Sequence, residues 1–549
     1  MIIFVFLLLG GTSAFADSVD TAWVRRYNNG PGYTDDRADA ISVDGLGNVY
    51  VTGSSWGSAN SYDYCTIKYD SNGTVKWIRT YDGPGHDADE AYAIAVDKQG
   101  NVYVTGVSIG DGTDYDFATI KYTSMGDVVW VRRYNGPANY WDSASDLAID
   151  SNGNIYVTGG SWGVATNFDY TTIKYNAQGD TLWVRRYDGS GHGPDVAEAI
   201  LIDVNGNVCV TGAVADEYTS YDYFTIKYSS QGNIIWVRQY DGFDNTDQAE
   251  SIATDNGGNV YVTGGSWGMS SGYDYVTIKY NSWGDTLWVQ RLSDPNHFAE
   301  SAEAIDIDPK GNVFVTGSGI SALDYAEDYI TVKYNAAGQQ VWIRYYSDPA
   351  KQKDIAHDIK ADAQGSVYVT GESYHSGSRY DYVTIKYDSS GNSLWIAVYD
   401  GVGNFYDMAY GLALDGMGNV YITGQSAGVV SDYDYTTIKY TQNGSDVKGE
   451  TIGIEEPSAF ALFQNYPNPF NQTTKIQFLI INSGFVSLNI YDILGRKVRT
   501  LVSENLSSGY KSVIWDGKNE EGKEVASGIY FYQLKMGDFS EPKKMLLLK

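Results

Sequence analysis

The sequence predicts an all-β protein, an eight-bladed β-propeller closed by its amino-terminal strand and followed by a small Ig-like β-sandwich. Two observations carry this prediction. With 61 Gly and 48 Tyr among 549 residues, the composition favours short strands joined by tight turns. The phrase GNVYVTG or a close variant also recurs at intervals of 52 to 54 residues, beginning at Gly47, Gly100, Gly153, Gly206, Gly258, Gly311, Gly365 and Gly418. A long, regular period is typical of propellers and solenoids.

Each repeat holds four strand-like segments. In the second repeat they are AYAIAVD (91–97), NVYVTG (101–106), DFATIKY (116–122) and VVWVRRY (128–134). Alternating side chains and flanking turn residues favour strands over helices. The Ala-rich first segment suits the narrow hub of a propeller, and the bulky fourth segment suits its rim. A β-solenoid is the alternative, but its repeats are usually shorter than a four-strand unit.

The outer strand of the last blade comes from the other end of the chain. In seven repeats a Trp follows the Tyr of the TIKY segment by eight positions, as Trp77 follows Tyr69. The eighth repeat has Lys448 at that step from Tyr440. The segment TAWVRRY (21–27) has the missing sequence and no repeat before it. We therefore expect it to pair with the eighth blade, which removes an open sheet edge.

The repeats resemble the SBBP-type β-propeller repeats of secreted bacterial proteins. The likeness rests on the DxxGNVYVTG phrase and on the Trp-bearing strand, and it covers roughly residues 21–445. It implies a surface or extracellular scaffold and brings no catalytic residues with it.

A change of composition marks a second domain. From Pro457 onward, 11 basic and 8 acidic residues give a net charge of +3, whereas the net charge of the whole chain is −30. The segments LFQNYPNPFN (462–471), LNIYDILGRKVRTL (488–501) and KMLLLK (544–549) alternate with turns, as in a small sandwich. This part resembles the type A carboxyl-terminal sorting domain of the type IX secretion system. The resemblance implies an export address read by an outer-membrane translocon; an ordinary Ig-like domain is the alternative.

The apolar run at the amino terminus ends in Ala14-Phe15-Ala16, which is typical of a secretory cleavage site. We expect a signal peptide over 1–16, the propeller over 17–445, a linker over 446–459 and the sorting domain over 460–549. The negative charge argues against nucleic acid as a partner. Cys65 and Cys209 lie in strand-like segments and are expected in the core, so no metal and no cofactor are predicted.

Charged positions recur in every repeat. Each third strand begins with an Asp and contains a Lys, and we expect each Lys to pair with a nearby Asp. An acid also precedes every inner strand, at Asp36, Asp89, Asp142, Asp195, Asp247, Glu300, Asp354 and Asp407. Such a ring of carboxylates suits a cation at the channel mouth, or it caps turns in every blade. Strict repetition favours the structural role, since catalysis requires unlike residues.

Function is therefore expected in the variable loops after the second and fourth strands. The candidate ligand-binding side chains there are Trp56, Trp162, Trp267, Tyr33, His86, Trp141, His192, His297 and His375. Exposed aromatic residues suit sugar rings or protein partners, although they also pack loops onto neighbouring blades. No nucleophile triad, HExxH or CxxC pattern is present, so no catalytic residue is assigned.

These features favour a secreted or outer-membrane cell-surface protein that is monomeric and not an enzyme. Its partners would be the type IX secretion machinery and a glycan or surface protein. The alternative is an extracellular polysaccharide-degrading lyase or glycosidase on a propeller scaffold. A structural surface-layer component is a third possibility.

Overall fold

The computed structural model divides into two compact units, Met1–Ser445 and Asp446–Lys549. It describes residues 18–29, 35–57, 61–215, 220–243, 245–268, 272–293, 297–321, 325–375, 378–403, 405–428, 433–443, 461–462, 465, 470–471, 473–480, 484–506, 509–537 and 539–548. The expected signal peptide and linker lie outside these ranges. No helix within the ranges is long and apolar enough to cross a membrane.

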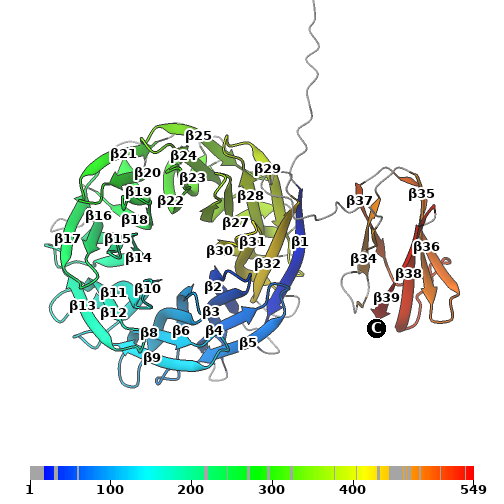
Figure 1. Ribbon diagram of the computed structural model, residues 1–549, viewed down its shortest axis with the longest axis horizontal. Coiled ribbons are helices and arrows are strands. Elements are labelled where there is room, and N and C mark those ends of the chain that lie inside the picture. Colours follow the sequence, from blue (N-terminus) through cyan, green and yellow to red (C-terminus); the bar gives the residue numbers. More distant parts are fainter. Residues whose placement is uncertain are drawn as a thin grey trace, which may run out of the picture. The chain divides into compact units, whose positions relative to one another are not determined.

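The first unit is a propeller of eight four-stranded antiparallel sheets (Figure 1). Blades 1 to 4 are β2 (Asp36–Val43), β3 (Val49–Trp56), β4 (Tyr62–Tyr69), β5 (Val75–Tyr81); β6 (Asp89–Val96), β7 (Val102–Ile109), β8 (Tyr115–Tyr122), β9 (Val128–Tyr134); β10 (Asp142–Ile149), β11 (Ile155–Trp162), β12 (Phe168–Tyr175), β13 (Thr181–Tyr187); and β14 (Val196–Ile202), β15 (Val208–Ala215), β16 (Tyr221–Tyr228), β17 (Ile234–Tyr240).

Blades 5 to 8 repeat this order, except that the outer strand of blade 8 is β1. They are β18 (Asp247–Thr254), β19 (Val260–Gly268), β20 (Gly272–Tyr280), β21 (Thr286–Leu292); β22 (His297–Ile307), β23 (Val313–Ser321), β24 (Glu327–Tyr334), β25 (Gln340–Tyr346); β26 (Asp354–Ala361), β27 (Val367–His375), β28 (Arg379–Tyr387), β29 (Ser393–Tyr399); and β30 (Asp407–Leu414), β31 (Val420–Ala427), β32 (Tyr433–Asn443), β1 (Ser18–Tyr27). Figure 1 shows the first strand of each blade at the hub and the fourth at the rim.

A tight turn sets the register of each inner hairpin. In blade 2 the Asp97 carboxylate accepts hydrogen bonds from the main-chain N–H groups of Gln99 and Asn101, both at 2.9 Å. Gly100 has φ of +78°, which favours glycine over any residue with a side chain. The recurring Asp and Gly of the repeat thus make the turn between the first two strands.

A bulge interrupts every inner hairpin. In blade 2 the pairing shifts between Ala91 and Ala93, where Ala91 faces Gly106. A Cβ on Gly106 would lie 2.0 Å from the carbonyl oxygen of Glu90, so only glycine fits. The bulge re-aims the side chain of Tyr92 relative to a regular strand.

Neighbouring blades are joined by a repeated set of contacts. Trp77 Nε1 and Lys68 Nζ both donate to the carbonyl oxygen of Ser124 in the next blade, at 3.2 and 2.9 Å. Lys227 forms the expected pair with an acid, at 2.8 Å from Asp203. Six other lysines donate to a main-chain oxygen of another blade instead of pairing with an Asp. They are Lys68, Lys121, Lys174, Lys279, Lys333 and Lys439.

The ring closes as the sequence predicts. The strand β1 pairs antiparallel with β32, and Trp23 faces Lys439 as Trp77 faces Lys68 in blade 1. Trp23 Nε1 and Lys439 Nζ both donate to Ser71 O, at 3.2 and 3.1 Å. The junction between blades 8 and 1 therefore has the same contacts as the junction between blades 1 and 2.

The second unit is an Ig-like sandwich of two sheets. One sheet has the order β33–β34–β37 and the other β36–β35–β38–β39. Their bounds are β33 (Ala461–Leu462), β34 (Thr474–Ile480), β35 (Gly484–Asp492), β36 (Lys497–Leu506), β37 (Gly509–Trp515), β38 (Gly528–Met536) and β39 (Phe539–Leu547). Trp515 is buried between the sheets and packs against Phe470 and Tyr530.

Candidate functional site

The acids that precede the inner strands are completely buried and bind main-chain N–H groups. Asp142 accepts from Gly136 N at 2.5 Å and from Trp162 N at 3.1 Å, which ties the loop between two blades to the end of the second strand. Equivalent pairs of donors bind Asp36, Asp195, Asp354 and Asp407. Burial raises the pKa of Asp36, Asp89, Asp195 and Asp354 to about 6. These contacts are those of turn caps, and they support the structural role.

The Asp that opens each third strand has an Arg partner in half of the blades. The Arg comes from the end of the outer strand of the same blade, and the ion pairs are Arg26–Asp434, Arg133–Asp116, Arg186–Asp169 and Arg291–Asp274, at 2.7 to 2.8 Å. The lysines of the third strands, expected to pair with a nearby Asp, are not the partners of these four acids. The second Arg of the WVRRY segment is the signal that identifies their partner.

The tryptophans of the loop after the second strand each pack edge-on against an aromatic ring of their own blade. Trp56 meets Tyr62 at 5.1 Å between ring centroids, and Trp267 meets Tyr273 at 5.2 Å. The two tryptophans therefore form separate aromatic pairs, one on blade 1 and one on blade 5. Trp267 is 38% exposed, while Trp56 is partly buried.

At the junction of blades 2 and 3, five rings form one aromatic cluster, defined as Tyr115, Tyr140, Trp141, Trp162 and Phe168. Their centroids follow one another at 5.0 to 6.0 Å, because Trp141 contacts Tyr115 and Phe168, and Trp162 contacts Phe168 and Tyr140. Tyr140 is 60% exposed and Trp141 48% exposed. The structure thus brings together two candidate residues, Trp141 and Trp162, on one accessible surface.

The histidine candidates lie apart from this cluster. His86 and His192 are exposed, and the Nδ1 of each lies within 2.8 Å of an Asp four residues earlier. His375 is partly buried between Asp348 and Asp381, at 3.1 and 3.3 Å. His297 begins β22 opposite Ser321, but its side chain is outside the described part, as is the whole of Tyr33.

Unlike side chains gather on the inner strands at the position that follows the first Ala. We call them the hub cluster: Asp39, Tyr92, Glu198, Glu250, Glu303, His357 and Tyr410. The His357 and Tyr410 rings are 5.6 Å apart, and the Arg37 guanidinium lies 5.3 Å from the Tyr410 ring and 2.5 Å from Asp39. The cluster breaks the eightfold repetition, as a specific site must.

Burial shifts the acids of this cluster strongly. Burial, followed by the charges of Glu198 and Glu303 on the adjacent blades, raises the pKa of Glu250 to about 8. Burial also raises the pKa of Asp39 to about 6, although Arg37 opposes the shift. Glu250 is thus a protonated carboxyl group near neutral pH.

A partly exposed lysine lies among acids next to the hub cluster. Lys360 Nζ is 2.9 Å from Asp358, and burial lowers its pKa. The charges of Asp358 and Asp306 outweigh burial and leave the pKa of Lys360 above its ordinary value, with a further contribution from Asp146. Asp146 belongs to blade 3 and Lys360 to blade 7, opposite in the ring, so charges interact across the hub.

Family comparisons agree with this architecture. Residues 22–60, 79–112, 129–169 and 235–269 match the model described as a beta-propeller repeat. Residues 470–538 match the FlgD Ig-like domain. No curated protein matches the sequence significantly.

Solved structures are similar to this chain at low sequence identity. PorZ, a surface component of the type IX secretion system of Porphyromonas gingivalis, is 13% identical, with 93% of this chain and 74% of that chain covered and a TM-score of 0.33. The propeller domain of the Trilobed protease of Pyrococcus furiosus is 8% identical, with 68% and 95% covered and a TM-score of 0.35.

Proposed function

We propose that this protein is a cell-surface or secreted scaffold whose propeller binds glycans through the aromatic cluster and whose Ig-like unit directs export by the type IX secretion system. The observation that carries the binding role is the pair of exposed rings, Tyr140 and Trp141, which contact Trp162 and Phe168 respectively. Rigid aromatic faces with polar edges bind sugar rings with little loss of side-chain entropy.

A glycan-array screen of the full mature chain tests the binding role. We expect Trp141→Ala to weaken binding at least about tenfold, equivalent to about 1.4 kcal/mol. Trp283→Ala is the matched control, because Trp283 is 76% exposed but lies in the turn between the third and fourth strands of blade 5. Unchanged glycan binding by Trp141→Ala would contradict the proposal. If the chain binds proteins and no glycan, the ligand of the aromatic cluster is a protein rather than a sugar.

The alternative, a polysaccharide-degrading enzyme, is favoured by the hub cluster. A carboxyl group that stays protonated near pH 7, such as Glu250, is suited to act as a general acid. The same glycans are therefore to be assayed for new reducing ends. Cleavage that Glu250→Gln abolishes would favour the enzyme over the scaffold.

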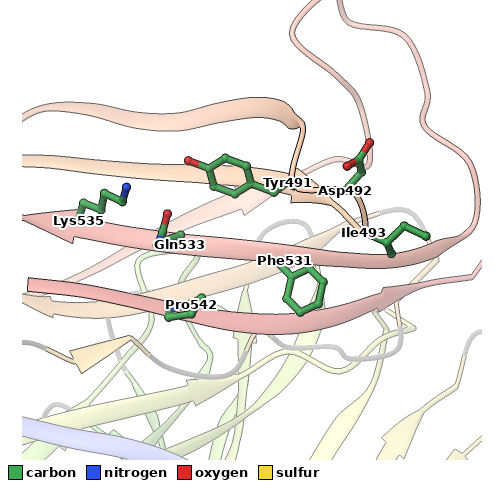
Figure 2. Close-up of a pocket in the computed structure, with 8 residues that line it drawn as sticks. Tyr491, Asp492, Ile493, Phe531, Gln533, Lys535 and Pro542 are labelled. Atoms are coloured by element: carbon green, nitrogen blue, oxygen red, sulfur yellow. The ribbon is translucent and has the colours of Figure 1, made fainter.

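The export role rests on the hairpin of β38 and β39. The Gly528–Tyr530 stretch pairs with the strand that contains the KMLLLK segment, with Tyr530 opposite Met545, so the two segments that we expect the machinery to read lie side by side. Beside this hairpin is an open concavity of about 460 Å³, lined by Tyr491, Phe531, Gln533 and Lys535 among others (Figure 2). We propose that the type IX secretion machinery binds at this concavity.

Removal of Phe539–Lys549 tests the export role in a bacterium that has this secretion system. We expect the shortened chain to remain in the periplasm, since β38 loses its pairing partner and the sorting surface is destroyed. Cell fractionation and immunoblotting measure the distribution. Phe485→Ala on the exposed part of β35 is the control that should be exported normally, and export of the shortened chain would contradict the proposal.

A further inference from the structure

A second group of aromatic rings lies at the junction of blades 7 and 8. Tyr374 packs edge-on against Tyr380, and Tyr380 stacks on Tyr406, each at 5.5 Å between ring centroids. Phe405 packs edge-on against Tyr406 at 4.5 Å and is 41% exposed. We call these four rings, together with Arg379, the arginine platform.

The platform repeats the arrangement of the aromatic cluster at the junction of blades 2 and 3. Tyr406 directly precedes β30 and contacts Tyr380 of β28 at 5.5 Å. Trp141 likewise directly precedes β10 and contacts Tyr115 of β8 at 5.5 Å. Among the eight repeats, only blades 3 and 8 have an aromatic residue immediately before the acid of the inner strand. The two junctions are therefore alike in their rings and differ from the other six.

The two junctions differ in the charge beside the rings. The residue before the third-strand ring is Arg379 in blade 7 and Asp114 in blade 2, and both side chains are exposed. In the other six repeats this position is neutral or acidic, so Arg379 is the only basic residue that the eight repeats have there. A specific site requires a departure of this kind from the repeat.

The Arg379 guanidinium is held by the rings rather than by an acid. Its Cζ lies 4.2 Å from the ring centroid of Phe405 and 5.3 Å from that of Tyr406. Nη1 donates to the Tyr406 hydroxyl at 2.8 Å, and no ion pair joins Arg379 to any residue that the structure describes. Because a guanidinium has five N–H donors, the others stay available to a ligand while stacking fixes the orientation of the group.

The carboxylates whose charges reach Tyr380 have partners other than Arg379. They are Glu327 beside Lys353 at 3.0 Å, Glu372 beside His357 at 3.5 Å, and Asp354, which accepts from Tyr374 N at 3.0 Å. In a chain with a net charge of −30, Arg379 is thus an exposed cation that none of these carboxylates neutralises directly. Such a cation is suited to bind an anion.

The main chain at Arg379 favours glycine. Its φ of +74° lies in the left-handed region, which residues with a side chain rarely adopt. The equivalent residue of blade 5 is Gly272, with a φ of +83°, so glycine forms the same turn without strain. Arginine in this conformation carries a cost that the turn itself does not require, which indicates a role for its side chain.

We propose that the arginine platform binds a sugar that carries an anionic group, either the carboxylate of a uronic acid or a sulfate ester. The sugar ring packs on the exposed part of Phe405, and the Arg379 guanidinium binds two oxygens of the anion side by side. Asp114 repels the same sugar from the junction of blades 2 and 3, so the two junctions select sugars of different charge. The sugar part of this ligand rests on the proposed function, whereas the anion rests on Arg379.

Isothermal titration calorimetry of the full mature chain tests the proposal with three probes: a galacturonic acid trisaccharide, its methyl ester and a sulfated trisaccharide. We expect an acidic probe to bind at least about tenfold more tightly than the neutral ester, because hydrogen bonds to charged groups are the stronger ones. Arg379→Gly should abolish this difference. The tighter of the two acidic probes identifies the anion.

The matched control is Lys98→Gln, which removes a positive charge from the turn between β6 and β7 and should leave the binding of all three probes unchanged. Arg379→Gly should keep the stability of the wild type in urea denaturation, because glycine suits the φ of +74°. A loss of binding therefore reports the side chain and not the fold.

Trp141→Ala separates this site from the proposed function. It should leave the binding of the acidic probe unchanged, so the two sites succeed or fail independently. Equal affinity for the acidic probes and the ester, or acidic-sugar binding that survives Arg379→Gly, would overturn the proposal. A hexaglutamate peptide that binds as tightly as the sugars would also overturn it, because the ligand would then be an acidic protein.

Discussion

Deletion of β1, Ser18–Tyr27, is expected to destabilise the propeller by at least about 5 kcal/mol, because the loss of one buried Trp side chain already costs about 3–5 kcal/mol. The deletion removes Trp23, which is buried against Tyr69 and Tyr421, together with nine residue pairs between β1 and β32. It also removes the ion pair between Arg26 and Asp434 at 2.8 Å. Urea denaturation followed by tryptophan fluorescence measures the loss.

The deleted chain should also become prone to aggregation, because β32 becomes an exposed edge. A synthetic peptide with the sequence of Ser18–Tyr27 should restore both stability and solubility by pairing with that edge. Trp283→Ala is the control, since this exposed Trp lies outside the blade junctions. A deleted chain as stable as the wild type would show that β1 does not close the ring.

The repeats made the blade count, the strand order and the closing strand predictable from the sequence. The reason is physical. The main-chain N–H and C=O groups of a segment such as TAWVRRY need hydrogen-bond partners beside the third strand of a blade, and in the repeat pattern blade 8 is the one that lacks an outer strand. The turn glycines, exemplified by Gly100 with its positive φ, fixed the position of each hairpin. The local sequence is therefore sufficient to predict a contact wherever that contact repeats in every blade.

Contacts between distant segments were not predictable in the same way. The lysines are expected to pair with Asp residues, but six of them donate to a main-chain oxygen instead, as Lys68 does to Ser124. The arginine partners of the third-strand acids are separated from them by a turn and a register shift between Lys121 and Tyr122, the kind of shift seen in each blade. A bulge likewise decides which way Glu250 points, and hydropathy patterns do not reveal bulges.

The candidate site was predictable only in part. The residue type and loop position of Trp141 and Trp162 identify them as candidates, whereas nothing in the sequence places Phe168 and Tyr115 beside them. Their assembly into one cluster depends on the packing of blade 2 against blade 3. The hub cluster is not predictable from a motif, because its position is constant in every repeat but the residue type at that position changes from blade to blade.

Raising the pH from 4.5 to 8 is expected to destabilise the propeller, and Glu250 should account for the largest part of this effect. Its pKa is raised from 4.5 to about 8 by burial and then by Glu198 and Glu303 on the adjacent inner strands. The folded state therefore holds a proton that the unfolded state releases above pH 4.5. Stability from this group is complete below pH 4.5 and is lost as the pH rises towards 8.

Glu250→Gln separates this effect from the other acids. One pKa unit corresponds to about 1.4 kcal/mol, and partial solvent access to the hub reduces the full shift, so the variant should exceed the wild type by about 2–4 kcal/mol at pH 8. At pH 4 the two should be equally stable, since Glu250 is then protonated in both states. Urea denaturation at each pH measures the difference, and Glu521→Gln, at an exposed site in the second unit, is the control. A wild type that becomes more stable between pH 5 and 8 would contradict this assignment, because burial of Glu250, Asp39 and Asp146 acts in one direction.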